Sequence, residues 1–271
     1  MSFSGRRTSY SKLGHLDVTG RLGRIVASLA SVPLIVAATL AHADGCAFEP
    51  QGEGRVVEII DGRSFRLADG REVRLAGIEP SAPGQAALAA IVGGKDVTLR
   101  GIDDAPDRYG RQSALVFVGS ANTPVQAQLL AEGTGLVSPE IADRACSTLL
   151  LAAEAEARDA KRGIWNNATV IKNAESPDDI LAGIGQLTVV EGRVLSVRQA
   201  GTTTYVNFGH NFTRDFAATI SRRMLPAVES GGVPLKSLEN RRIRVRGWVE
   251  ARPGPRIEVL HAGQIEVLSG N

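Results

Sequence analysis

Val73-Arg74-Leu75-Ala76-Gly77-Ile78-Glu79 and Asp107-Arg108-Tyr109-Gly110-Arg111 are the two runs of sequence that decide the fold. Each run places an arginine beside residues that favour turns. The segment between them is long enough for one helix and one strand, so a fold can bring both guanidinium groups to one anion. We therefore take Arg74 and Arg111 as candidate anion-binding residues.

The residues around the first run predict a three-stranded meander. Residues 54–60 read as a strand, Asp61-Gly62 is a strong hairpin signal, and a second turn at 68–70 leads into residues 72–78. Further along we expect a helix at 85–92, strands at 95–100 and 112–118, and helices at 123–132 and 143–162. Five strands with inserted and appended helices are typical of a small barrel of the OB type.

The last third of the chain predicts a second β-rich domain. Five strands are expected there, at 187–198, 202–208, 215–220, 242–251 and 256–260, with a short helix near 221–229. This order is again OB-like. The fold class is therefore α+β and mainly β: an OB barrel with appended helices at 44–168, a linker at 169–186, and a second small OB-like barrel at 187–271.

The first 43 residues read as an export signal. Arg21 and Arg24 precede an apolar run at 25–40, and Ala41-His42-Ala43 places small residues where a signal peptidase cuts. We expect export by the general secretory route to a periplasmic or extracellular location, with no stable membrane insertion after cleavage. An uncleaved membrane anchor is the alternative.

The two cysteines, Cys46 and Cys146, both lie beyond this segment. In an oxidising compartment two cysteines of an exported chain most simply pair. The alternative is a pair of buried free thiols.

Charge is divided unevenly between the two expected domains. Residues 44–184 contain 14 basic and 21 acidic side chains, whereas residues 185–271 contain 12 and 7. The positive charge of the C-terminal part would therefore attract a nucleic-acid partner more strongly than the acidic N-terminal part would. There, alternation along 242–249 predicts an outward stripe that includes Arg244, Arg246 and Trp248, a pattern suited to single-stranded DNA or RNA. A solvated strand with its arginines paired to glutamates is the alternative.

Residues 54–165 resemble the staphylococcal nuclease (thermonuclease) family. The resemblance rests on five runs in order, at 57–62, 73–78, 107–111, 129–136 and 163–165. It implies that Arg74 and Arg111 hold a phosphodiester, that Tyr109 lies beside the nucleotide, and that Glu79 takes the place of a metal-binding aspartate. Members of this family use Ca²⁺ and a glutamate that activates water, so Ca²⁺ would be the cofactor of an active site, with Asp61 as a weaker metal ligand.

Two positions depart from that pattern. Arg63 stands where the first metal carboxylate is expected, and Ala82 stands where the general base is expected. A cation opposes a metal ion, and loss of a positioned base reduces a rate by about 10² to 10⁴. We therefore expect no bound cofactor, and we expect Arg63 either to extend the anion pocket or to pair with Glu79.

Three functions follow from this pattern. The first is an exported nuclease homologue with a degenerate site that binds nucleic acid or another phosphate-bearing anion. The second is an active metal-dependent phosphodiesterase that uses Glu79, Asp61 or the Asp103-Asp104 loop. The third is a non-catalytic envelope scaffold or partner-binding protein. Whether the chain is an enzyme remains open at this stage.

Overall fold

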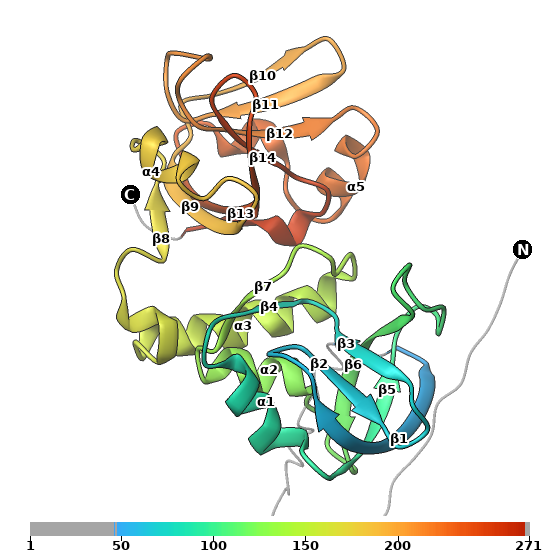
Figure 1. The fold of residues 1–271 in the computed structure, drawn as a ribbon. Coiled ribbons are helices and arrows are strands. Elements are labelled where there is room, and N and C mark those ends of the chain that lie inside the picture. Colours follow the sequence, from blue (N-terminus) through green and yellow to red (C-terminus); the bar gives the residue numbers. More distant parts are fainter. Residues whose placement is uncertain (1–45, 47, 269–271) are drawn as a thin grey trace, which may run out of the picture. The chain divides into compact units, whose positions relative to one another are not determined.

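Five strands with alternating buried and exposed side chains close an N-terminal barrel. Their order around the barrel is β1-β2-β3-β6-β5, and β3 and β6 are the parallel pair. The strands are β1 (Pro50–Ile59), β2 (Ser64–Leu67), β3 (Glu72–Leu75), β5 (Asp96–Arg100) and β6 (Arg111–Val118). The expected OB-type barrel is therefore present, with a closed sheet of five strands (Figure 1).

The computed structural model describes residues 46 and 48–268, so the expected export signal at 1–43 lies outside the described residues. Within the described part, no helix is both long and apolar enough to span a membrane.

Helices pack against the barrel and share its hydrophobic core (Figure 1). They are α1 (Gly84–Val92), α2 (Val125–Ala131), α3 (Arg144–Asp159) and the 3₁₀ turn η1 (Gly163–Asn166). Two short strands, β4 (Ile78–Pro80) and β7 (Gly135–Val137), pair beside them. Phe65, Val73 and Leu88 are fully buried in the common core, and each such side chain contributes about 1.5–3 kcal/mol through burial.

Two glycines allow the end of α2 to meet the end of α3. Gly133 and Gly163 both have positive φ, and a Cβ on Gly133 would lie 2.2 Å from the carbonyl oxygen of Arg162. The close approach lets the Ile164 N–H donate to the Gly133 carbonyl at 2.9 Å. Glycine is needed at both positions because other residues rarely adopt this backbone conformation and lack the space.

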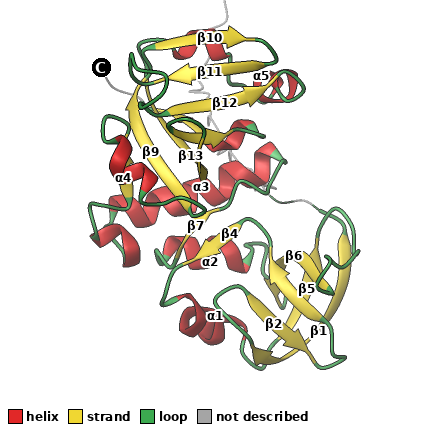
Figure 2. Ribbon diagram, turned by 45° about the horizontal axis from the view of Figure 1, so that its top comes forward, coloured by secondary structure: helices red, strands yellow, loops and turns green. Residues whose placement is uncertain are grey.

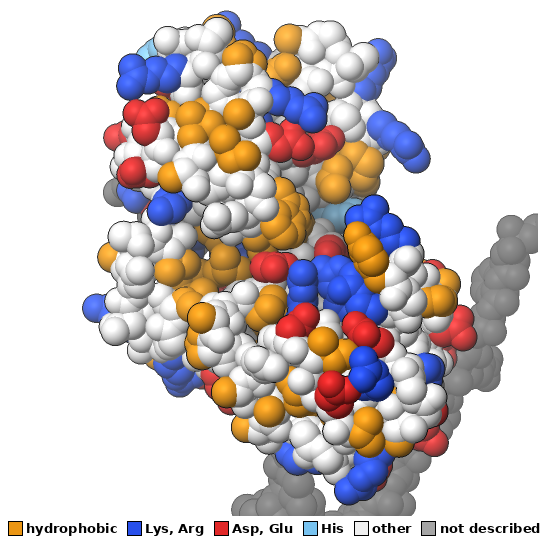
Figure 3. All heavy atoms as spheres, in the orientation of Figure 1, with side chains coloured by type: hydrophobic (Ala, Val, Ile, Leu, Met, Phe, Trp, Pro, Cys, Tyr) orange, Lys and Arg blue, Asp and Glu red, His pale blue; other side chains and the backbone are white. Residues whose placement is uncertain are grey.

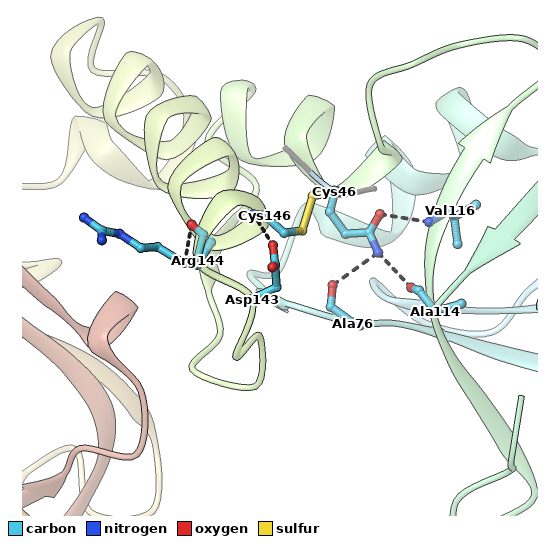
Figure 4. Close-up of a disulfide and its surroundings, with 9 residues drawn as sticks. Cys46, Ala76, Ala114, Val116, Asp143, Arg144 and Cys146 are labelled. Atoms are coloured by element: carbon cyan, nitrogen blue, oxygen red, sulfur yellow. Dashed lines mark hydrogen bonds between the residues drawn. A yellow bond between two sulfur atoms is a disulfide. The ribbon is translucent and has the colours of Figure 1, made fainter. Parts of the chain in front are cut away.

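The expected disulfide joins Cys46 to Cys146 across 100 residues of sequence. Asp143 caps α3, because its carboxylate accepts the Cys146 N–H at 2.7 Å (Figure 4). The bridge therefore fixes the segment that precedes β1 to the first turn of α3.

The remaining strands form one eight-stranded sheet within the described residues. Its main order is β10-β11-β12-β14-β13-β9-β8, and β15 pairs with β13. The strands are β8 (Ile171–Asn173), β9 (Leu187–Arg193), β10 (Ser196–Ala200), β11 (Thr203–Asn207), β12 (Ala217–Ser221), β13 (Arg242–Ala251), β14 (Pro255–Glu258) and β15 (Ile265–Val267). We call this the C-terminal sheet.

Short helical segments complete this part of the chain. They are α4 (Pro177–Leu181), α5 (Leu225–Ser230), η2 (Leu235–Leu238) and η3 (Ala262–Gln264). A second hydrophobic core, which includes Phe216, Ile243 and Val245, lies against the sheet. Strand β8 and helix α4 fall within the expected linker 169–186, and β8 pairs in parallel with β9. Most of this segment is therefore part of the folded structure.

Candidate anion-binding site

Arg74 and Arg111 lie on one outward face of the N-terminal barrel. In the parallel pair of β3 and β6, Glu72 lies opposite Arg111 and Arg74 lies opposite Ser113. The intervening residues Val73 and Gln112 point inward and are buried. Because side chains alternate along a strand, the two arginines are diagonal neighbours on the same surface.

Arg111 is held by the turn that precedes its strand. Its Nε and Nη2 atoms donate to Asp107 Oδ2 at 3.1 and 2.8 Å. Asp107 Oδ1 also accepts the backbone N–H groups of Tyr109 and Arg111. The hydrogen bonds from Arg111 and from the backbone lower the pKa of Asp107 to about 2, and the same ion pair raises the pKa of Arg111.

Tyr109 projects from this turn between two arginines. Its ring centroid lies 4.7 Å from the guanidinium carbon of Arg108 and 5.0 Å from that of Arg111. The side chain is 65% exposed. The nucleotide contact that the resemblance implies for Tyr109 stays a prediction, for which an exposed aromatic ring and two neighbouring cations offer stacking and charge.

Arg74 is partly buried and has unused donors. Its nearest carboxylate is Glu140, at 3.5 Å from Nη2. Its Nε atom is buried and has no hydrogen-bond partner among residues 46 and 48–268. Because Nε is covered, an anion would contact Arg74 through its Nη groups, where charge-assisted hydrogen bonds are available.

Arg63 occupies the position where a metal ligand was expected. Its Nη1 atom bonds directly to Glu79 Oε2, and both side chains are partly buried, at 21% and 26% exposure. Asp61 accepts the backbone N–H of Arg63 at 2.8 Å. Of the two arrangements expected for Arg63, the structure contains the pair with Glu79.

These residues do not fit Ca²⁺. The ion prefers six to eight oxygen ligands, whereas here a guanidinium lies on the carboxylate that would bind it. Across residues 46 and 48–268, no three His, Cys, Asp or Glu side chains are arranged to hold a metal. Ala82 is exposed at the turn before α1 and offers no acid or base.

Charges of both signs share the outward face. Figure 3 shows Lys and Arg side chains gathered over β3 and β6, with Asp and Glu side chains beside them. Arg66, for example, pairs with Glu58 and also lies 3.9 Å from Glu72. The surface therefore presents a small basic cluster rather than a broad basic patch.

The predicted stripe on β13 is wrong for Arg246. Its side chain is 1% exposed and bonds to Glu154 of α3 and Glu266 of β15. Burial opposes the charge of Arg246, but the two carboxylates raise its pKa. Arg244 is also mostly covered and paired with Glu191 at 2.7 Å, so Trp248, at 41% exposure, is the accessible member of the predicted set.

Two carboxylates at the site were not predicted from the sequence. Asp107 had a readable signal, because an aspartate two residues before an N–H in a turn often accepts it and because Arg111 follows four residues later. Glu140 had no signal in the sequence, because its distance from Arg74 depends on how the segment after β7 packs.

The closed barrel, its appended helices and the arginine pair agree with the fold and the anion-holding residues that the resemblance implies. Residues 82–167 match the family model described as staphylococcal nuclease homologue. The resemblance is thus confirmed for this part of the chain, which includes Arg111 and Tyr109, and the match supports a nuclease-like or nucleic-acid-binding homologue. No match was found among curated proteins.

Proposed function

We propose that the protein is an exported nuclease homologue that binds nucleic acid or another phosphate-bearing anion without metal-dependent hydrolysis. The ion pair between Arg63 and Glu79 is the observation that carries this proposal. The arginines that would hold an anion, Arg74 and Arg111, remain in the site. The guanidinium of Arg63 occupies the position where a metal would bind.

The anion would lie between Arg74 and Arg111. Arg74, whose side chain is 20% exposed, would offer its Nη groups, and Arg111 keeps Nη1 free of Asp107. Tyr109 would contact a base or another flat group next to the phosphate. Guanidinium groups bind phosphate oxygens with strong, charge-assisted hydrogen bonds.

Export is supported by the N-terminal sequence and by the disulfide. Bridges such as Cys46–Cys146 persist in oxidising compartments and are rare in reducing ones. Fractionation of cells that express the protein tests this part of the proposal. A protein that stays in the cytoplasm with free thiols would contradict it.

The binding experiment uses purified, oxidised protein and labelled single- and double-stranded DNA and RNA, with Ca²⁺, Mg²⁺ or EDTA. We expect salt-dependent binding and no cleavage. Arg74→Gln should weaken binding, and because each phosphate contact to a single strand contributes about −0.7 to the salt slope, it should reduce that slope by about 0.7. Arg55→Gln is the matched control, since Arg55 is exposed on β1.

The alternatives appear as other outcomes of this experiment. Metal-dependent cleavage that Arg74→Gln abolishes would establish the active phosphodiesterase. Neither binding nor cleavage would favour the scaffold, in which the paired acidic groups Asp107 and Glu140 simply neutralise the arginines.

A further inference from the structure

A cavity of about 420 Å³ opens on the C-terminal sheet. Its walls include Arg198, Tyr205, Phe212, Arg252 and Arg256. The hairpin β10–β11, the loop before β12, the turn between β13 and β14, and strand β14 itself contribute these residues. Figure 2 shows β10, β11 and β12 side by side in this part of the chain. The volume falls within the range of small-molecule sites. These residues are separate from Arg74, Arg111 and Tyr109.

Arg256 is a buried cation with unsatisfied bonding capacity. It is 5% exposed, and its Nη atoms donate to the carbonyl oxygens of Phe212, Asp215 and Pro255. Its Nε has no hydrogen-bond partner in the part of the chain that the structure describes. Burial lowers the pKa of Arg256. Within residues 46 and 48–268, no carboxylate oxygen lies within 4.0 Å of its guanidinium.

A comparison with Arg246 shows that Arg256 lacks a directly bound carboxylate among the described residues. Both arginines are buried in the same sheet, but Arg246 contacts the carboxylates of Glu154 and Glu266. A buried charge is unfavourable unless a counter-charge accompanies it. Neutral carbonyl oxygens supply hydrogen bonds to Arg256 but no negative charge, so an anionic ligand would complete its surroundings.

The neighbouring charges favour an anion on one side of Arg256. Arg198 is exposed on the rim, and its strand partner is Tyr205. Arg252 also lines the cavity and pairs with Glu250. A smaller hollow of about 180 Å³ shares Tyr205, Arg252 and Arg256 with this cavity, but Glu250 and Glu258 also line it. The anionic group therefore fits the larger cavity, where the lining charges are arginines.

Asp215 makes no ion pair with Arg256 within 4.0 Å, although its charge raises the pKa of Arg256 against the larger effect of burial. Its Oδ2 atom accepts the backbone N–H of Asn211 at 2.8 Å and so holds the loop before β12 closed. The loop carbonyl oxygens that orient Arg256 belong to Phe212 and Asp215 themselves. The guanidinium is thus positioned by the backbone, and its charge is only partly offset by Asp215.

Aromatic and apolar groups provide the rest of the wall. Phe212 is 54% exposed at the cavity, and Tyr205 and Pro253 face the same space. Flat side chains of this kind stack on planar rings. We propose that this cavity binds a small ligand made of a planar aromatic ring with a phosphate or carboxylate group, with the anion on Arg256 and the ring on Phe212 and Tyr205.

The test uses the purified protein, NMR shifts of backbone amides and calorimetry. The probes are adenosine 5′-monophosphate for the phosphate form and benzoate for the carboxylate form, with adenosine and inorganic phosphate as the separate halves. We expect saturable shifts around Phe212 and Arg252 with at least one complete probe. Each half alone should bind about tenfold more weakly, because it lacks either the charged contacts or the stacking.

Variants separate this site from the first one. Phe212→Ser and Arg256→Gln should each raise the Kd about tenfold. Arg223→Gln, an exposed change outside the cavity, and Arg74→Gln, a change in the other site, should leave it unchanged. If Arg256→Gln does not fold, Phe212→Ser and Arg198→Gln decide, since both residues are exposed.

Three results would overturn the proposal. The first is no saturable shift with either complete probe. The second is an unchanged Kd in the cavity variants. The third is equal affinity for inorganic phosphate, which would remove the role of the ring. Loss of nucleic-acid binding in Arg74→Gln, with this cavity unaffected, would bear on the first site alone.

Discussion

Arg246→Met should destabilise the fold more than any change on the barrel surface. The substitution leaves Glu154, which is 0% exposed, without the guanidinium that contacts both of its oxygens at 2.8 and 2.9 Å. Val137 N–H and Arg158 still reach that carboxylate. Breaking a buried pair from one side typically costs about 3–5 kcal/mol, and we expect a loss of that size.

A double-mutant cycle with Glu154 tests whether the pair of Arg246 and Glu154 accounts for this loss of stability. Glu154→Leu alone removes the main counter-charge of Arg246, whereas the double variant leaves neither charge unpaired. We therefore expect the double variant to lose less than the sum of the single losses, by about 2–3 kcal/mol. Arg193→Met, an exposed change on β9, should stay within about 0.5 kcal/mol of the wild type.

The two tryptophans allow the effect to be located. Trp165 is buried next to α3, and Trp248 lies on β13, so they report on opposite sides of the pair. Urea unfolding followed in the Trp165→Phe and Trp248→Phe backgrounds should give one transition for wild type and separate midpoints for Arg246→Met. A loss below about 1 kcal/mol, or additive single effects, would refute the role given to the pair.

Three further changes probe the disulfide, the Asp107 turn and the filled metal position. Replacing Cys46 and Cys146 with alanine should lower the free energy of unfolding by about 2–5 kcal/mol in urea, because the bridge closes a long loop; no change would mean that the bridge adds nothing. The pKa of Asp107 in the folded protein is lowered to about 2. Its pair with Arg111 should therefore stabilise the fold above pH about 4, and this stabilisation should be lost as the pH falls through about 2. In acid unfolding, Asp107→Asn should lose less stability than the wild type over that pH interval. Millimolar Ca²⁺ should leave the Tm of the wild type unchanged but raise the Tm of Arg63→Asp. A rise in the Tm of the wild type with Ca²⁺ would contradict the conclusion that Arg63 fills the metal position.

Much of the barrel could be predicted because local signals agree with the global fold. Strand β13 runs over the predicted residues 242–251, and β6 begins within one residue of its expected start. The turn at Asp61-Gly62 lies between β1 and β2 as the hairpin signal required. Alternation and turn residues determine such elements within a short window of sequence, so long-range contacts are not needed to find them.

Arg246 shows where this reasoning ends. Alternation correctly placed it on the face opposite Ile243 and Val245, but alternation cannot say what covers that face. Here α3 covers it, and the contact joins residues 92 positions apart (Figure 2). The same limit applies to β15, which pairs with β13 from a short segment with little periodic signal.

The charge partners of the arginine pair limit the affinity of the proposed anion site. A phosphate between Arg74 and Arg111 must compete with Glu140 and Asp107, and the site lies on the acidic part of the chain. Glu140 is the weaker competitor, because it lies 3.5 Å away and is 42% exposed, whereas Asp107 is bound through two nitrogens of Arg111. An anion would therefore displace Glu140 from Arg74 and bind Arg111 through its remaining Nη1 group. Glu140→Gln should therefore strengthen anion binding. Asp107→Asn should instead loosen the turn that positions Tyr109. A search for the natural ligand is thus best made with the Glu140→Gln variant.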